Sequence, residues 1–208
     1  MSQKGIKTTT YSLDWETLIR LETRLQYKVR TQIGNDSNVQ DLLIISLGSR
    51  LGLRVGELLK LTWNELKGIK PGERIIINEQ KTGKQRIVIM SQRLRETLDF
   101  VSSNSETPEN HYVIKSQKSK GLKPMSIQNF NLRLKKILKE NNIRFIGNPS
   151  SHLLRKTWVV GSIKKGFESG DHLSLVKVSR LIGHSNISTT LRYTNFEVSQ
   201  SFNLFELN

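Results

Sequence analysis

Cysteine is absent from this chain of 208 residues. Its absence excludes disulfide bonds and a cysteine-ligated zinc site, and it is typical of a reducing compartment. Long apolar runs are also missing: the longest, DLLIISLG at residues 41–48, is far too short to span a bilayer. Residues 1–12 are polar and lack the apolar core of a signal peptide. These absences predict a soluble cytoplasmic protein with no membrane partner.

Acidic residues are scarce relative to basic ones. The chain carries 18 Asp and Glu against 33 Lys and Arg, which gives a formal net charge of +15. Such an excess favours a polyanionic partner, most simply double-stranded DNA, because neutralised phosphates release their counterions. An anionic membrane surface is the competing interpretation, but no basic amphipathic segment stands beside a lipidation signal. No phosphate-binding G-x-x-x-x-G-K-[ST] loop and no carboxylate cluster with metal-ligand spacing occurs, so we expect neither nucleotide hydrolysis nor a metal or other cofactor.

The periodicity of apolar residues predicts an α+β domain that is mainly helical with a small antiparallel sheet. Ser12 is the expected N-cap of the first helix, in which Leu13, Leu18, Leu21 and Leu25 form an apolar stripe. Two β-branched runs around a Gly-containing turn predict a hairpin within residues 73–90, and residues 111–114 read as a short strand. Helices are expected within residues 12–29, 38–53, 55–63, 91–103, 124–142, 148–167 and 173–183.

A one-sided basic segment lies between Lys115 and Arg144. It contains nine Lys and Arg against a single acid, Glu140. A charge run is usually a solvated face, but this asymmetry favours a surface that follows DNA phosphates. With one lysine from the hairpin turn, the predicted DNA-binding residues are Lys84, Lys118, Lys120, Lys123, Arg133 and Lys136.

Three short segments combine residue types that serve phosphate chemistry. In SHLLRKTW, His152 and Arg155 are three residues apart, so on a helix they share a face next to buried leucines. Polar side chains in that position need partners or a function. Arg54 and Glu57 in GLRVGELL, taken alone, predict no more than a surface ion pair. His184 and Tyr193 in LIGHSNISTTLRYT, taken alone, predict a helix cap and a packed aromatic ring.

Taken together, these segments resemble the tyrosine recombinase (phage-integrase-like) family. That family has a GLR-x-x-E-L segment around a catalytic Arg, an H-x-L-R motif, and an L-x-G-H motif followed nine residues later by a Tyr, and the chain has each of these in the same order. The family also has a catalytic Lys on a β-hairpin, for which QKTGKQRIV offers Lys81, with Lys84 as the alternative. The other tyrosines, Tyr11, Tyr27 and Tyr112, lack such neighbours and are expected to be packing residues.

The resemblance implies the fold of a recombinase catalytic domain and a set of roles. Tyr193 is the expected nucleophile, which forms a 3′-phosphotyrosyl intermediate and releases a 5′-hydroxyl. Arg54 and Arg155 would stabilise the negative charge on the phosphate oxygens, and Glu57 would hold Arg54 in place. Lys81 would protonate the leaving oxygen, His152 would assist proton transfer at the tyrosine, and His184 would donate a hydrogen bond to the phosphate.

The resemblance also sets the expected domain organisation and partners. Residues 1–11 are expected to be a polar tail and residues 12–208 the catalytic domain, with a helix at about 196–208 that docks on its own protomer or on a neighbour. No N-terminal core-binding domain is expected in this chain, so it is either an excised catalytic domain or a short recombinase of the fimbrial-switch type. We expect a monomer when unbound and a homo-tetramer on DNA. The alternatives are a non-catalytic DNA-binding protein and a type IB topoisomerase-like enzyme.

Overall fold

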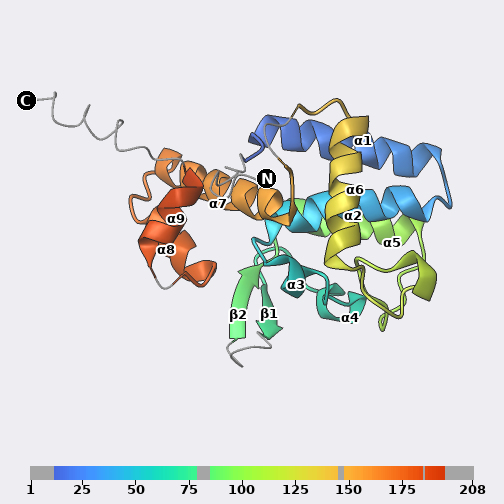
Figure 1. Ribbon diagram of the computed structural model, residues 1–208. Coiled ribbons are helices and arrows are strands. Elements are labelled where there is room, and N and C mark those ends of the chain that lie inside the picture. The colour runs from blue at the N-terminus through green and yellow to red at the C-terminus, as the bar shows by residue number, and fades with distance from the viewer. Residues whose placement is uncertain (1–11, 79–84, 145–147, 185, 195–208) are drawn as a thin grey trace, which may run out of the picture. The chain divides into compact units, whose positions relative to one another are not determined.

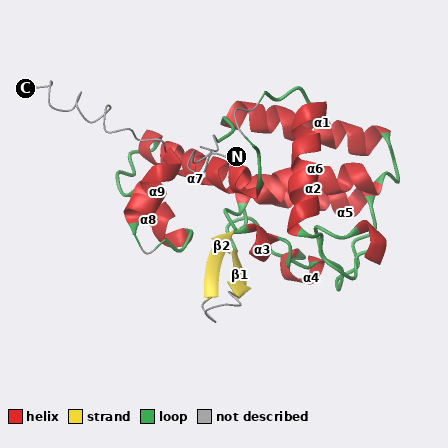
Figure 2. Ribbon diagram, in the orientation of Figure 1, coloured by secondary structure: helices red, strands yellow, loops and turns green. Residues whose placement is uncertain are grey.

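The structure, a computed structural model, describes residues 12–78, 85–144, 148–184 and 186–194 (Figure 1). Most of the described chain is helical, with one two-stranded sheet (Figure 2). The chain divides into two compact units, Met1–Trp158 and Val159–Asn208. The elements are α1 (Trp15–Thr31), α2 (Asp36–Arg50), α3 (Val55–Leu58), α4 (Trp63–Leu66), β1 (Arg74–Asn78), β2 (Gln85–Ile89), α5 (Gln92–Asn104), the 3-10 helix η1 (Gln117–Ser119), α6 (Ile127–Glu140), α7 (Ser151–Glu168), α8 (Ser174–Leu181) and α9 (Ile187–Thr194). The predicted mainly helical α+β fold is confirmed.

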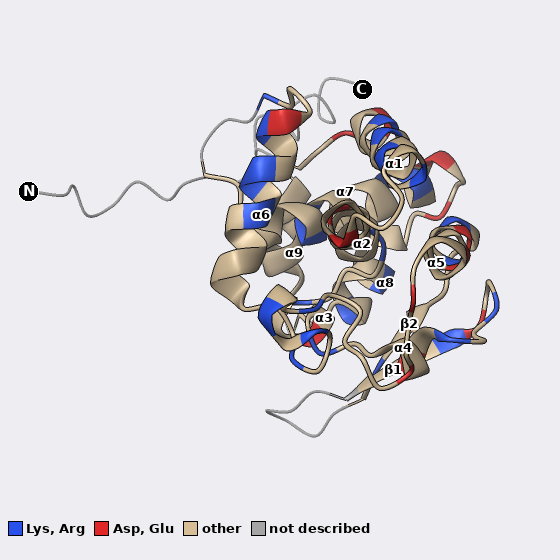
Figure 3. Ribbon diagram, turned by 90° about the vertical axis from the view of Figure 1, so that its right-hand side faces the viewer, with Lys and Arg blue, Asp and Glu red and all other residues tan. Residues whose placement is uncertain are grey.

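The first unit is built around α2. Every residue from Asn38 to Arg50 is buried, and α2 packs against α1, α5 and α6. Figure 1 shows α6 crossing α2 steeply, and Figure 3 shows α2 end-on among its neighbours. The apolar residues of α2 face partners on several sides, so this helix is buried all round.

The stripe predicted for α1 is confirmed. Leu18, Leu21 and Leu25 are at most 1% exposed. The predicted N-cap is wrong, because the carboxylate of Asp14, two residues after Ser12, accepts a hydrogen bond of 2.8 Å from the Thr17 N–H. An Asp at this position satisfies an otherwise unpaired N–H group of the first turn and also favours the positive end of the helix dipole.

The predicted hairpin is confirmed. β1 and β2 pair antiparallel, with Ile75 opposite Val88 and Ile77 opposite Arg86. The side chains of these four residues are buried, which places one face of the hairpin against the core and fixes the register. Residues 79–84, which connect the strands and contain the predicted turn, lie outside the described residues.

Two details of the rest of the first unit differ from the prediction. Residues 111–114 form no strand; Tyr112 makes an isolated bridge to Thr62, and the Val113 N–H donates to the Leu61 carbonyl. Tyr27, expected to pack, is 68% exposed because it lies on the outer side of α1.

The second unit contains the C-terminal part of α7, and α8 and α9, which pack against each other. Gly183, at φ +71°, ends α8 as predicted. Among the described residues, no helix has the length and apolar character needed to cross a membrane. The predicted tail at 1–11 and the predicted helix at 196–208 lie outside the described residues.

Candidate active site

The turn after α2 holds Arg155 in place. Gly52 has φ +61°, and a Cβ there would lie 2.5 Å from the indole of Trp158. Glycine therefore permits both the turn and the close approach of α7. The Gly52 carbonyl accepts a hydrogen bond of 2.6 Å from Arg155 Nη1, and Arg155 is only 3% exposed. Arg155 is thus anchored from α7 onto the segment that leads to Arg54.

Arg54 stands at the N-terminus of α3, and Glu57 holds it. The Glu57 carboxylate accepts a hydrogen bond of 2.8 Å from the Arg54 backbone N–H and contacts Arg54 Nη1 at 3.3 Å. The Arg54 side chain remains 49% exposed, whereas Glu57 is 13% exposed. Half of a capping box thus fixes the backbone of Arg54, while its guanidinium reaches solvent. The ion pair that the sequence alone predicts is present.

Arg86 is a second partner of Glu57 that the sequence analysis missed. Its Nη1 lies 2.8 Å from Glu57 Oε2, and its side chain is 7% exposed. One carboxylate therefore joins two guanidinium groups, from the start of α3 and from β2. A signal was present in the sequence: Arg86 is two residues before Val88, so in a strand it points to the buried face, where an Arg needs a carboxylate. Lys81 and Lys84 belong to residues 79–84, between β1 and β2, and lie outside the described residues.

His152 lies on the exposed side of α7. It lies in the first turn of the helix and is exposed, three residues before the buried Arg155. The next residue, Lys156, is 6% exposed, and burial lowers the pKa of its ammonium group. The start of α7 therefore holds two buried cationic side chains and one solvent-facing imidazole.

In the second unit, the end of α8 positions His184. The Gly183 N–H donates to the Arg180 carbonyl at 3.0 Å, and the His184 N–H donates to the Ser179 carbonyl at 3.1 Å. These two bonds form a Schellman motif, which depends on the positive φ of Gly183. The backbone of His184 is therefore fixed by the preceding helix.

The side chain of His184 meets α9. Its Nδ1 lies 2.9 Å from Thr190 Oγ1, which donates to Ser179 Oγ at 2.9 Å. Tyr193 is three residues after Thr190 and so lies on the same side of α9. The His184 and Tyr193 rings are 5.5 Å apart between centroids, with an interplanar angle of 47°. The structure thus brings together two of the predicted catalytic residues within this unit.

The predicted catalytic residues therefore form two local groups, each described within its own unit. The first unit holds Arg54 and Arg155 at the Gly52 turn, with His152 on α7. The second unit holds His184 beside Tyr193. Among the described residues, no three His, Asp or Glu side chains are grouped as metal ligands.

The predicted DNA-binding residues have different surroundings. Lys118, Lys120 and Lys123 lie in and beside η1 and are exposed. Lys136 is on α6, 69% exposed, and only loosely paired at 3.7 Å with Glu140. Figure 3 shows Lys and Arg recurring along α6.

Arg133 is different, and its geometry argues against the predicted DNA contact. Its Nε lies 2.5 Å from Asp41 Oδ1, and the two side chains are 14% and 12% exposed. The same guanidinium donates to the backbone carbonyl and the hydroxyl of Ser37. Arg133 thus joins α6 to α2, and we withdraw it from the predicted DNA-binding set.

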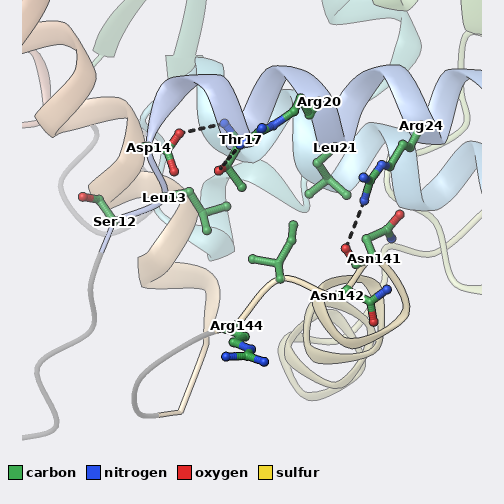
Figure 4. Close-up of a pocket in the computed structure, with 11 residues that line it drawn as sticks. Ser12, Leu13, Asp14, Thr17, Arg20, Leu21, Arg24, Asn141, Asn142 and Arg144 are labelled. Carbon is green, nitrogen blue, oxygen red and sulfur yellow. Dashed lines mark hydrogen bonds between the residues drawn. The ribbon is translucent and has the colours of Figure 1, made fainter.

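A cavity of about 470 Å³ lies between the start of α1 and the loop after α6 (Figure 4). Arg20, Arg24 and Arg144 contribute to its lining, and Arg24 Nη1 donates to the Asn141 carbonyl at 3.2 Å. None of the predicted catalytic residues that the structure describes lines this cavity. The predicted catalytic residues in the described part of the chain therefore lie outside this hollow.

Comparison with known proteins identifies the family. A model of the phage integrase family matches residues 22–199. The chain belongs to the phage integrase family. The match includes every predicted catalytic residue, so the motif resemblance found in the sequence is confirmed at the level of the family.

Individual relatives agree with this assignment. The chain is 27% identical over 206 residues to the TnP I resolvase of Bacillus thuringiensis, covering 97% of this chain and 65% of the resolvase. It is 29% identical over 179 residues to tyrosine recombinase XerC of Caldanaerobacter subterraneus, covering 83% of this chain and 46% of XerC. The chain thus spans about half to two thirds of the length of these curated relatives.

Solved structures confirm the fold of this phage integrase family member. The crystal structure of XerH site-specific recombinase, bound to palindromic difH substrate as a post-cleavage complex, matches with a TM-score of 0.66 and 17% identity. The match covers 99% of this chain and 55% of that one. The predicted recombinase catalytic-domain fold is therefore correct.

Proposed function

We propose that this chain carries the strand-transfer centre of a site-specific DNA recombinase. The observation that carries the proposal is that Arg155 is anchored on the Gly52 carbonyl, two residues before Arg54, whose backbone Glu57 fixes and whose side chain is half-exposed. Planar guanidinium forks match the oxygens of a phosphodiester and stabilise the charge that develops as it is attacked. Family membership supports the same chemistry.

In the proposed reaction the hydroxyl of Tyr193 attacks the scissile phosphorus and loses its proton. The bond from phosphorus to the 5′-oxygen breaks, which leaves a 3′-phosphotyrosyl enzyme, and a general acid protonates the departing oxygen. Lys81 is the proposed general acid, His152 assists the proton transfer at Tyr193, and His184 donates a hydrogen bond to the phosphate. The covalent intermediate conserves the bond energy, so no high-energy cofactor is needed.

The proposed partner is double-stranded DNA, and the proposed outcome is integration, excision or inversion. The exposed lysines at 118, 120, 123 and 136 and the net charge of +15 support DNA binding. Recombination between two duplexes cleaves four strands, one at each of four active sites, so we propose a homo-tetramer on DNA that assembles from monomers.

The test is formation of a covalent protein–DNA adduct. Nicked duplexes that tile the DNA flanking the coding sequence of this chain are incubated with protein, and adducts are resolved on a denaturing gel. We expect an adduct with the wild type and none with Tyr193→Phe. Tyr27→Phe is the matched control, because Tyr27 is 68% exposed and outside both catalytic groups, and should retain the adduct.

Other outcomes decide against the proposal. An adduct that persists in Tyr193→Phe would remove Tyr193 as the nucleophile. Specific binding without any adduct would favour the non-catalytic alternative. Relaxation of supercoiled plasmid regardless of its sequence would favour the topoisomerase-like alternative.

A further inference from the structure

The carboxylate of Glu57 connects strand β2 to Arg54. Its Oε2 accepts from the Arg54 backbone N–H at 2.8 Å and lies 2.8 Å from Arg86 Nη1, while its Oε1 lies 3.3 Å from Arg54 Nη1. A guanidinium group only donates and an ionised carboxylate only accepts, so the direction of each of these hydrogen bonds is fixed. All three residues belong to the first unit, and the connection is therefore made within one compact body.

The two guanidinium groups differ in burial. The Arg54 side chain is 49% exposed, whereas those of Glu57 and Arg86 are 13% and 7% exposed. A long exposed side chain samples many rotamers unless a partner restrains it. Because Arg86 contacts the Glu57 carboxylate from the buried side, that carboxylate is a restrained partner for Arg54.

Packing alone does not require an Arg at position 86. The hairpin register pairs Arg86 with Ile77 and places it on the same buried face as Ile75 and Val88. An apolar side chain there would continue this face and would avoid the cost of removing a charge from water. Replacing a buried ion pair with apolar residues of similar volume is often neutral for stability. The charge of Arg86 therefore indicates a function beyond stabilising the hairpin.

We infer that Arg86 is a positioning residue, which holds the Glu57 carboxylate in place and, through it, the guanidinium of Arg54. The inference rests on the proposed function for its catalytic consequence, because Arg54 is one of the two groups proposed to stabilise the charge on the phosphate. Arg86 acts through Glu57 and not by contact with DNA. Substitution of Arg86 should therefore change the rate of cleavage and leave the affinity for DNA nearly unchanged.

The first test measures the mobility of Arg54 without DNA. The full chain is prepared with ¹⁵N-labelled arginine, the Arg54 Nε–H signal is identified by its loss in Arg54→Lys, and its order parameter is obtained from ¹⁵N relaxation. We expect an ordered Nε–H in the wild type and a lower order parameter in both Arg86→Met and Glu57→Gln. An Arg54 side chain that is as mobile in the wild type as in Arg86→Met would overturn the inference.

The second test is a double-mutant cycle on single-turnover cleavage, with a saturating amount of the nicked duplex that gives the wild-type adduct. Arg86→Met and Glu57→Gln should each lower the rate by about tenfold or more, since a misplacement of about 1 Å can cost about 100-fold. The double variant should be no slower than the slower single variant, because both changes act through one carboxylate. Losses that multiply in the double variant would contradict the inference.

Arg95→Met is the matched control. The Arg95 side chain is 15% exposed, donates to the Leu66 carbonyl at 2.9 Å and lies 2.6 Å from Asp99 Oδ1. This variant also removes a largely buried, carboxylate-paired guanidinium, but outside both catalytic groups, so it should cleave at the wild-type rate. An equal loss of rate in Arg95→Met would assign the effect to general disturbance of the fold and overturn the inference.

A conservative variant provides the rescue, and thermal unfolding shows that each variant is folded at the assay temperature. Arg86→Lys keeps a cation on β2 without the planar fork, so it should recover part of the rate and of the Arg54 order that Arg86→Met loses. No recovery of either in folded Arg86→Lys would contradict a role for the charge.

The two proposals fail in distinguishable ways. Absence of a wild-type adduct would refute the proposed function, while the Arg54 order parameter would still decide whether Arg86 restrains Arg54. Wild-type cleavage by a folded Arg86→Met variant would refute the positioning role even if Tyr193 is confirmed as the nucleophile.

Discussion

At the scale of single residues, burial and ion pairing give different roles to basic side chains that are equivalent in the sequence pattern. Arg133 and Lys136 lie three residues apart on α6 in the same basic segment. Lys136 is largely exposed, whereas Arg133 is nearly buried against Asp41. Burial raises the pKa of the Asp41 carboxyl, and the adjacent Arg133 guanidinium partly offsets this effect. Arg133 therefore compensates a buried charge.

Replacing Arg133 should reduce stability and leave DNA affinity unaffected. In Arg133→Gln the Asp41 carboxylate stays buried without its cation, and we expect a loss of about 3 kcal/mol in the free energy of unfolding at pH 7, measured by urea denaturation. The pKa of Asp41 should rise further. A folded-state pKa above the unfolded value means that stability falls as pH rises through it, so the loss should be smaller near pH 4 than at pH 7.

Lys136→Gln is the matched control for that measurement. Its exposed, loosely paired ammonium group should contribute less than about 0.5 kcal/mol to stability. If Arg133→Gln were as stable as Lys136→Gln but bound DNA more weakly, the original assignment of Arg133 to the DNA surface would be right.

At the scale of elements, the candidate site depends on contacts between segments far apart in the sequence. At the Gly52 turn, Arg155 of α7 donates to the Gly52 carbonyl and the Trp158 ring packs close to the Gly52 backbone. Separately, Glu57 of α3 forms an ion pair with Arg86 of β2. Strand β2, which follows the segment containing Lys81, is thereby joined to α3, whose N-cap residue is Arg54. In the second unit, the Schellman motif at Gly183 fixes the backbone of His184 at the end of α8.

Gly52→Ala should disturb this arrangement. A methyl group at φ +61° is strained and would meet the Trp158 ring at 2.5 Å, so we expect a loss of roughly 1–3 kcal/mol in unfolding free energy. The displaced Gly52 carbonyl should also release Arg155 and slow adduct formation. Thermal unfolding and the nicked-duplex assay measure the two effects.

Gly56→Ala provides the comparison for this substitution. A Cβ at Gly56 meets nothing within 4 Å, and its backbone has no positive φ, so alanine should be neutral or stabilise the protein by up to about 1 kcal/mol. Equal stabilities of the two variants would show that the turn tolerates a side chain and that its glycine is not required.

At the scale of the whole molecule, net charge predicts how DNA binding responds to salt. The exposed lysines at 118, 120 and 123 form one group within the first unit. If all three contact phosphate, replacing them with Gln should reduce the slope of log affinity against log salt by roughly 2.7, since each phosphate contact contributes about 0.9. Affinity measured across a series of salt concentrations gives the slope.

A charge-matched triple variant separates local contact from net charge. Lys28, Lys67 and Lys70 lie outside the basic segment, and replacing them with Gln changes the formal charge by the same amount. That variant should keep the wild-type slope. Equal reductions in both triple variants would mean that long-range charge, and not this surface, governs binding.

The sequence by itself determined the family, the helical fold and the order of the motifs, because hydrophobic periodicity and motif spacing are local properties that a linear chain displays. It also placed the hairpin and the end of α8 at Gly183. It could not determine which charges are buried, because burial depends on what packs opposite. Only the tertiary structure showed that Arg133 pairs with Asp41 and that Arg86 pairs with Glu57. It also showed the hydrogen bonds that connect His184 to Thr190 and Thr190 to Ser179. Each of these changes depends on a partner from another element, and the geometry of such pairs is set by packing.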